Sequence, residues 1–138
     1  MLFRSVMLTD KPMNEEQLDY IFRLKTGALI EAAFMAGGII AGCDENVTKL
    51  LEETGYNIGF AFQIKDDILD VTSTQEVLGK PVLSDERNNK TTYVTLYGME
   101  KAEKDTADMS VKALETLKTI GHNEYLEDLI TMLIHRDR

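Results

Sequence analysis

The sequence has little of several residue types that would narrow its function. Cys43 is the only cysteine among 138 residues, which excludes an internal disulfide and a cysteine-based zinc site. The two histidines, His122 and His135, stand far from it and match no metal-binding spacing. Positive charge is also scarce, since 15 Lys and Arg face 24 Asp and Glu for a net charge of −9. This balance argues against nucleic acid or an anionic membrane as a partner. A cytoplasmic location fits a chain without disulfides.

The N-terminal stretch lacks the long apolar run of a secretory signal peptide. Residues 1–5, MLFRS, are apolar and basic and share no pattern with the residues after them. We expect them to be a non-native leader, because the codons CTC TTC CGA TCT of a common sequencing adapter encode Leu-Phe-Arg-Ser. A frayed native terminus is the alternative. Residues 6–138 are expected to belong to a single domain.

Strand signals are missing, because apolar and polar residues do not alternate and turn clusters are few, so we predict an all-α fold. The first helix is predicted to begin after Pro12, where Asn14 and Gln17 have the spacing of a capping box. It continues through the apolar segment 27–42, in which Glu31 is the one charged residue. Such a helix is either buried in a larger protein or spans a membrane, and its short length and its charge favour burial.

The rest of the chain is predicted to form four more helices. They are expected over residues 46–71, 91–98, 99–120 and 124–136. Gly55 and Gly59 indicate a bend or tight packing in the first of these. Ser73 or Thr74 is expected to cap a short turn after it, and Asn123 is expected to cap the last helix.

Three carboxylates crowd one helical turn, at Asp66, Asp67 and Asp70. Asp66 and Asp70 are four residues apart and share a face, Gln63 lies on nearly the same face, and Asp67 points roughly a third of the way round. Like charges this close repel each other unless a cation relieves them. Mg²⁺ is suited to this, because it binds one or two carboxylates and completes its shell with water and substrate phosphate. A solvated acidic helix face is the alternative, although the flanking residues are mostly apolar.

Lysines stand on both sides of the carboxylates in the sequence. Lys80 and Lys90 lie in a polar loop, and each can act as a point charge on phosphate oxygens. Lys25 stands beside Thr26 at the edge of the apolar helix, where an ammonium group needs either a path to solvent or a buried anion. Loop lysines are usually only solvated, but beside a carboxylate cluster they suggest a diphosphate held between metal and ammonium groups.

Two longer segments carry a resemblance to a known family. GFAFQIKDDILD, followed by LGKPVLSDERNNKTTYVTLYG, resembles the second aspartate-rich region of trans-prenyl diphosphate synthases, which include farnesyl and geranylgeranyl diphosphate synthases. KTGALIEAAFMAGGIIAG resembles the Lys-Thr helix of the same family. The resemblance runs from about Val6 to the C-terminus. It implies a partial isoprenoid-synthase helical bundle, the C-terminal half of the all-helical prenyltransferase fold.

The resemblance also implies a reaction and a metal. Asp66, and less directly Asp67 and Asp70, resemble the ligands of a Mg²⁺ ion bound to the allylic diphosphate. In the implied reaction the allylic diphosphate ionises, and the double bond of isopentenyl diphosphate attacks the carbocation, giving a product of the farnesyl or geranyl type. Metal ions and lysines would stabilise the negative charge that develops on the departing pyrophosphate.

Other positions take roles from the same resemblance. Lys25, Lys80 and Lys90 resemble the lysines that bind the diphosphate. Thr26 and Gln63 resemble residues that line the cavity near the reacting carbons and the bridging oxygen.

The chain departs from the family pattern in two ways. Asp85 keeps the acidic position of the loop, but Leu83 stands where many relatives have glycine. The family's first aspartate-rich motif, which lies in its N-terminal half, has no counterpart here. We therefore expect a partial chain that is inactive alone, and a homodimer for the full-length enzyme.

Two other functions compete with this interpretation. A non-catalytic partner subunit would keep the fold without the chemistry, but it would not need to keep Lys25, Gln63, Asp66 and Lys90 together. A terpene cyclase would usually carry Asn, Ser and Glu in its second metal motif rather than the sequence DDILD.

Overall fold

The computed structural model of the chain describes residues 13–78 and 91–136, and for residues 73–78 it describes the backbone alone. Within these ranges every regular element is a helix and none is a strand, so the all-α prediction is confirmed. The expected leader, residues 1–5, lies outside the described residues, and so do Lys80, Asp85 and Lys90.

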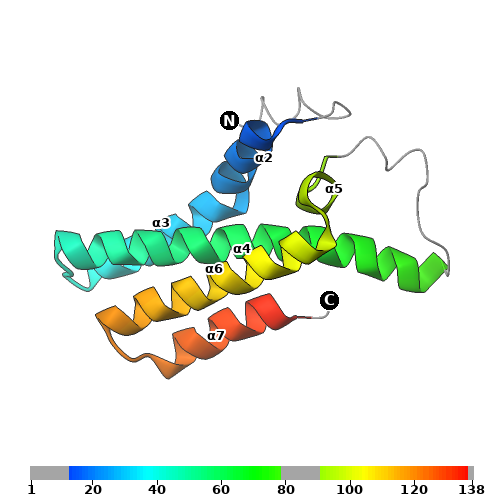
Figure 1. Cartoon of the computed structure of the whole chain (residues 1–138). Coiled ribbons are helices and arrows are strands. Elements are labelled where there is room, and N and C mark those ends of the chain that lie inside the picture. The colour runs from blue at the N-terminus through cyan, green and yellow to red at the C-terminus, as the bar shows by residue number, and fades with distance from the viewer. Residues whose placement is uncertain (1–12, 79–90, 137–138) are drawn as a thin grey trace.

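One long helix, α4, organises the molecule. The elements in chain order are α2 (Glu15–Phe22), the π-helix η1 (Arg23–Gly27), α3 (Ala28–Ile40), α4 (Glu45–Leu78), α5 (Tyr93–Tyr97), α6 (Met99–Ile120) and α7 (Glu124–His135). Each of the others contacts α4. Figure 1 shows α6 and α7 lying side by side along one flank of α4, whereas α2 and α5 rise from the opposite flank.

The helix ends agree with the local signals of the sequence. Asn14 Oδ1 accepts a hydrogen bond from the Gln17 amide at 2.9 Å, and Gln17 Oε1 accepts one from the Asn14 amide at 3.1 Å, which confirms the capping box. Asn123 Oδ1 accepts from the Leu126 amide at 3.0 Å and caps α7. Gly98 has a φ of +85°, a conformation that glycine adopts without strain, and it separates α5 from α6.

The second predicted helix is longer than expected. α4 continues to Leu78, so the predicted end near residue 71 and the predicted cap at Ser73 or Thr74 are wrong. The hydroxyl of Thr72 donates to the carbonyl of Ile68 at 3.0 Å. A hydroxyl that is satisfied in this way by its own helix does not need to end the helix.

Glycines let the first helical segment approach α4 closely. A Cβ atom on Gly59 would lie 2.5 Å from the Cα of Gly27, and one on Gly55 would lie 2.7 Å from the Cα of Glu31. Only a residue without a side chain fits at either position, so the prediction of tight packing at Gly55 and Gly59 is confirmed. The predicted continuous first helix is interrupted, because residues Arg23–Gly27 form a wider π turn between α2 and α3.

The apolar segment, which was predicted to be buried in a larger protein, is only partly covered in this chain. Leu29, Ile39 and Ile40 of α3 are 74%, 63% and 86% exposed, because α3 packs along one side on α4 and η1. α3 has 13 residues, and none of the helices in the two described ranges is long and apolar enough to cross a membrane.

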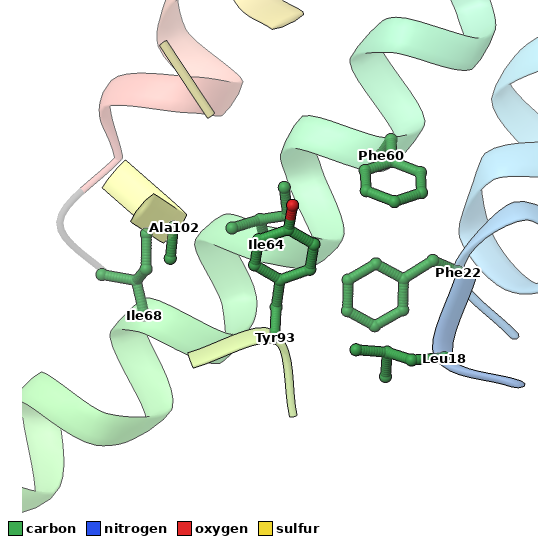
Figure 2. Packing of buried hydrophobic residues seen from close by; sticks show 7 residues of the cluster. All are labelled: Leu18, Phe22, Phe60, Ile64, Ile68, Tyr93 and Ala102. Carbon is green, nitrogen blue, oxygen red and sulfur yellow. The ribbon is translucent and has the colours of Figure 1, made fainter. Parts of the chain in front are cut away.

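Two apolar clusters hold the helices together. The first joins α2, α4, α5 and α6, and Figure 2 shows its buried side chains: Leu18, Phe22, Phe60, Ile64, Ile68, Tyr93 and Ala102. The second joins α4, α6 and α7 through Ile58, Ala61, Ala113, Leu117, Ile130 and Ile134. The first cluster includes the first residue of α5 and therefore fixes the position of α5 relative to the aspartates of α4.

Candidate active site

A hydrogen bond connects the π turn to α4. Gln63 is 6% exposed, and its Nε2 donates to the Thr26 hydroxyl at 2.7 Å. The bond joins residues 37 positions apart and brings together two residues that were predicted to line the same cavity. A π turn holds one more residue than an α-helical turn and often occurs at functional sites. Here that turn contains Lys25 and Thr26.

Lys25 projects from the same turn. Its side chain is exposed, and it forms no ion pair with any residue in the described ranges. The ammonium group of Lys25 is therefore available to an anion. Lys25 is followed by Thr26, which is hydrogen-bonded to Gln63.

Two of the three aspartates contact different parts of the chain. Asp66 Oδ1 pairs with Nη2 of Arg136, and Asp67 Oδ2 accepts a hydrogen bond from the Tyr93 amide at 2.7 Å. Asp70 is exposed. No three His, Cys, Asp or Glu side chains within residues 13–78 and 91–136 converge as a metal-binding group, so the three aspartates do not form one by themselves.

Arg136 was not predicted as a site residue. Its guanidinium lies over the ring of Phe62, 3.9 Å from the ring centre, which is a favourable cation–π position. Its Nε is buried and has no hydrogen-bond partner in the described part of the chain. The residue follows α7 directly, and it links the end of that helix to Asp66 across 70 positions of sequence.

Tyr93 is fixed by its ring and by its hydroxyl. Tyr93 is 6% exposed, and the centre of its ring lies 6.1 Å from the ring centres of both Phe22 and Phe60. The hydroxyl donates to Asp105 Oδ2 at 2.6 Å. Burial and this hydrogen bond raise the pKa of Tyr93 above its ordinary value, so the side chain stays neutral.

Asp105 responds in the opposite direction. Burial alone raises the pKa of its carboxyl group, but hydrogen bonds from Lys101 and Tyr93 outweigh burial and lower the pKa below its ordinary value. The charged carboxylate therefore accepts the Tyr93 hydroxyl at neutral pH and holds α5 against α6.

The carboxylates of α4 offer the oxygen ligands that a magnesium ion prefers. Asp66 and Asp70 offer oxygen atoms from one face of α4, and the Asp66 side chain is 45% exposed. Mg²⁺ takes one or two carboxylates from a protein and fills its remaining positions with water and phosphate oxygens. Since Arg136 contacts Asp66 Oδ1, a metal ion would share that oxygen with the guanidinium or displace it.

Sequence reasoning missed Arg136 because a lone arginine 70 positions away gives no local signal. Tyr93 was visible, since it ends the segment KTTY, but nothing in the pattern indicated that its amide would bind Asp67.

Comparison with known proteins gives a consistent result. A sequence profile described as polyprenyl synthetase matches residues 4–132. The chain is 40% identical over 129 residues to a farnesyl diphosphate synthase from Micrococcus luteus. It is 36% identical to a geranylfarnesyl diphosphate synthase from Aeropyrum pernix over an alignment 144 positions long. These alignments cover 93% and 96% of this chain but 44% and 45% of the two relatives.

A solved structure extends the comparison to the fold. The crystal structure of a geranyltransferase from Legionella pneumophila superposes with a TM-score of 0.70 at 29% identity. The match covers 91% of this chain and 39% of that one. The chain thus spans less than half the length of the relatives that it matches.

Proposed function

Because the chain belongs to the polyprenyl synthetase family, we propose that it is the C-terminal half of a Mg²⁺-dependent prenyltransferase that joins isopentenyl diphosphate to an allylic diphosphate. The observation that carries this proposal is the hydrogen bond between Gln63 and Thr26. It joins the turn that contains Lys25 to α4, one helical turn before Asp66. A cation for the diphosphate and a carboxylate for the metal thus belong to two elements in direct contact.

Two groups of residues in this chain bind the allylic diphosphate, one directly and one through the metal ion. Lys25, together with Lys80 and Lys90, supplies positive charge to the phosphate oxygens. Asp66 holds the Mg²⁺ ion, and Asp67 and Asp70 contribute less directly. When bound, the metal stabilises negative charge on the departing pyrophosphate.

The reaction breaks the allylic carbon–oxygen bond and forms one carbon–carbon bond. The electron pair of the broken bond leaves with pyrophosphate, the isopentenyl double bond attacks the allylic carbon, and one proton is lost from the isopentenyl unit. Thr26 and Gln63 lie near the reacting carbons in this proposal. Their mutual hydrogen bond gives the Gln63 amide nitrogen and the Thr26 hydroxyl oxygen a partner other than water. Keeping water away from this part of the cavity protects the carbocation from hydrolysis.

The other half of the enzyme covers the exposed side of α3. Leu29, Ile39 and Ile40 would otherwise form an apolar surface in water, and each large side chain left exposed forfeits about 1.5–3 kcal/mol. The 44% coverage of the Micrococcus luteus relative leaves room for that half. We further propose a homodimer for the complete enzyme and a cytoplasmic location, which suits a chain with one unpaired cysteine.

The test measures prenyl transfer with and without the other half. The purified 138-residue chain is incubated with Mg²⁺, labelled isopentenyl diphosphate and an allylic diphosphate, first alone and then with an N-terminal half that carries its own DDxxD motif. We expect no product from the chain alone and Mg²⁺-dependent product from the pair. If a monodisperse pair formed but gave no product, the chain would be a non-catalytic partner subunit instead.

A further inference from the structure

The two adjacent aspartates of α4 have different partners. Asp66 pairs with Arg136, the residue that follows α7. Asp67 Oδ2 instead accepts a hydrogen bond from the backbone amide of Tyr93 at 2.7 Å. Consecutive residues on a helix point about 100° apart, so one carboxylate cannot substitute for the other. The contact of Asp67 joins α4 to the first residue of α5 across 26 positions of sequence.

The Tyr93 amide needs an acceptor outside its own helix. Tyr93 is the first residue of α5, and the first amides of a helix have no carbonyl acceptor within it. The preceding cap serves another amide, because Thr92 Oγ1 accepts from the Thr95 amide at 3.1 Å. Asp67 therefore accepts a hydrogen bond from the Tyr93 amide, a donor that the Thr92 side chain does not satisfy. A hydrogen bond to a charged carboxylate is also stronger than one to a neutral group.

Other contacts hold the same segment from different directions. The Thr91 hydroxyl accepts a hydrogen bond from the Met13 amide at 2.8 Å, next to the start of α2. The Tyr93 hydroxyl reaches Asp105 on α6, and its ring lies among the buried side chains in Figure 2. Within the described ranges, the Asp67 bond is the hydrogen bond that joins the backbone of this segment to α4.

We infer that Asp67 is a positioning residue, which anchors the start of α5 to the aspartate turn of α4 through the Tyr93 amide. The inference rests on the proposed function and refines it, since it gives Asp67 an indirect role in the site whose metal Asp66 holds. It requires an oxygen acceptor at position 67 but not a negative charge. That requirement separates it from metal ligation, in which replacing a carboxylate by an amide weakens binding of a hard cation.

The experiment compares Asp67→Asn with Asp67→Ala in the full 138-residue chain. The first readout is hydrogen exchange at the Tyr93 amide, resolved by fragmentation mass spectrometry at low protein concentration. Asparagine keeps an oxygen that can accept a hydrogen bond from the Tyr93 amide, so we expect Asp67→Asn to retain most of the protection of the parent. Asp67→Ala has no acceptor, and its Tyr93 amide should exchange at least about tenfold faster, as expected for loss of a hydrogen bond to a charged group. Equal and fast exchange in both variants would overturn the inference.

The second readout is binding of inorganic pyrophosphate in the presence of Mg²⁺, with Asp66→Asn as the matched variant. We expect Asp67→Asn to bind within about twofold of the parent and Asp66→Asn to bind at least about tenfold more weakly. If Asp67→Asn were as weak as Asp66→Asn, Asp67 would be a direct ligand and the inference would be wrong. If Asp66→Asn bound like the parent, the proposed metal role of Asp66 would fail, and the exchange experiment would still decide the role of Asp67.

Discussion

Gln63 and Thr26 form a side-chain hydrogen bond of 2.7 Å between α4 and the π turn, and Gln63 is only 6% exposed. We predict that Thr26→Val lowers the free energy of unfolding by about 1–3 kcal/mol, because it leaves a buried amide group without its acceptor. Urea unfolding measures this. Thr26→Ser keeps the hydroxyl and should stay close to the parent. A Thr26→Val chain as stable as the parent would mean that this bond does not stabilise the fold.

The contact between Gly59 and Gly27 gives a second prediction. In Gly59→Ala the new Cβ would lie 2.5 Å from the Gly27 Cα, so a backbone must move, and we expect a loss of about 1–3 kcal/mol in the free energy of unfolding. Gly37→Ala is the matched control on α3, because a Cβ there meets no described atom within 4 Å. Alanine in a helix interior is favoured over glycine, so this control should gain about 0.5–1 kcal/mol. A Gly59→Ala chain as stable as the Gly37→Ala chain would contradict the close packing of η1 on α4.

Local signals predicted the helix ends well, because caps depend on residues a few positions apart. The box of Asn14 and Gln17 and the cap at Asn123 are both present. The predicted cap at Ser73 or Thr74 shows where local reasoning fails, because α4 continues past both residues. A hydroxyl residue also fits inside a helix when it bonds the preceding turn, as the neighbouring Thr72 does. Thr106 and Ser110 behave in the same way on α6. Both are buried, although polar, because each donates to a carbonyl four residues earlier.

The candidate site was predicted in its residue types but not in its contacts. Gln63, Thr26 and Asp66 were singled out from spacing and resemblance, and the first two do meet. The partners of the aspartates were not foreseen, because Arg136 and Tyr93 come from elements 70 and 26 positions away. Such contacts depend on how α5 and α7 pack on α4, which residue spacing does not encode.

The pair of Asp66 and Arg136 predicts competition between the guanidinium and a metal ion. We expect Arg136→Gln to raise the affinity of the chain for Mg²⁺ alone by roughly two- to fivefold, because partly exposed ion pairs contribute about 1 kcal/mol or less. Calorimetric titration with Mg²⁺ measures this without any direct effect of the arginine on a diphosphate. Lys112→Gln removes an exposed lysine that pairs with Glu53 at 2.8 Å and should leave the affinity unchanged. A lower affinity in Arg136→Gln would show that the arginine orients Asp66 for the metal instead.

The lowered pKa of Asp105 predicts a stability that depends on pH. Its carboxyl group is harder to protonate in the folded chain than in the unfolded chain. Its contribution is therefore complete above its ordinary pKa of 3.8 and is lost as the pH falls through the lower folded value. The free energy of unfolding should therefore fall more between pH 7 and pH 3 for the parent than for Asp105→Asn. Urea unfolding at the two pH values measures the difference. Identical falls would show that the bonds from Lys101 and Tyr93 do not stabilise the charged form.

The rate of isopentenyl incorporation by the paired halves tests the central claim most directly. The claim is that Asp66 holds the metal of a prenyltransferase, so Asp66→Ala should lower the rate by about 10²–10³-fold, as expected when one group that stabilises developing charge is removed. Asp108→Ala, an exposed aspartate on α6, should keep the rate of the parent. An Asp66→Ala pair that turned over as fast as the parent at limiting Mg²⁺ would contradict the account.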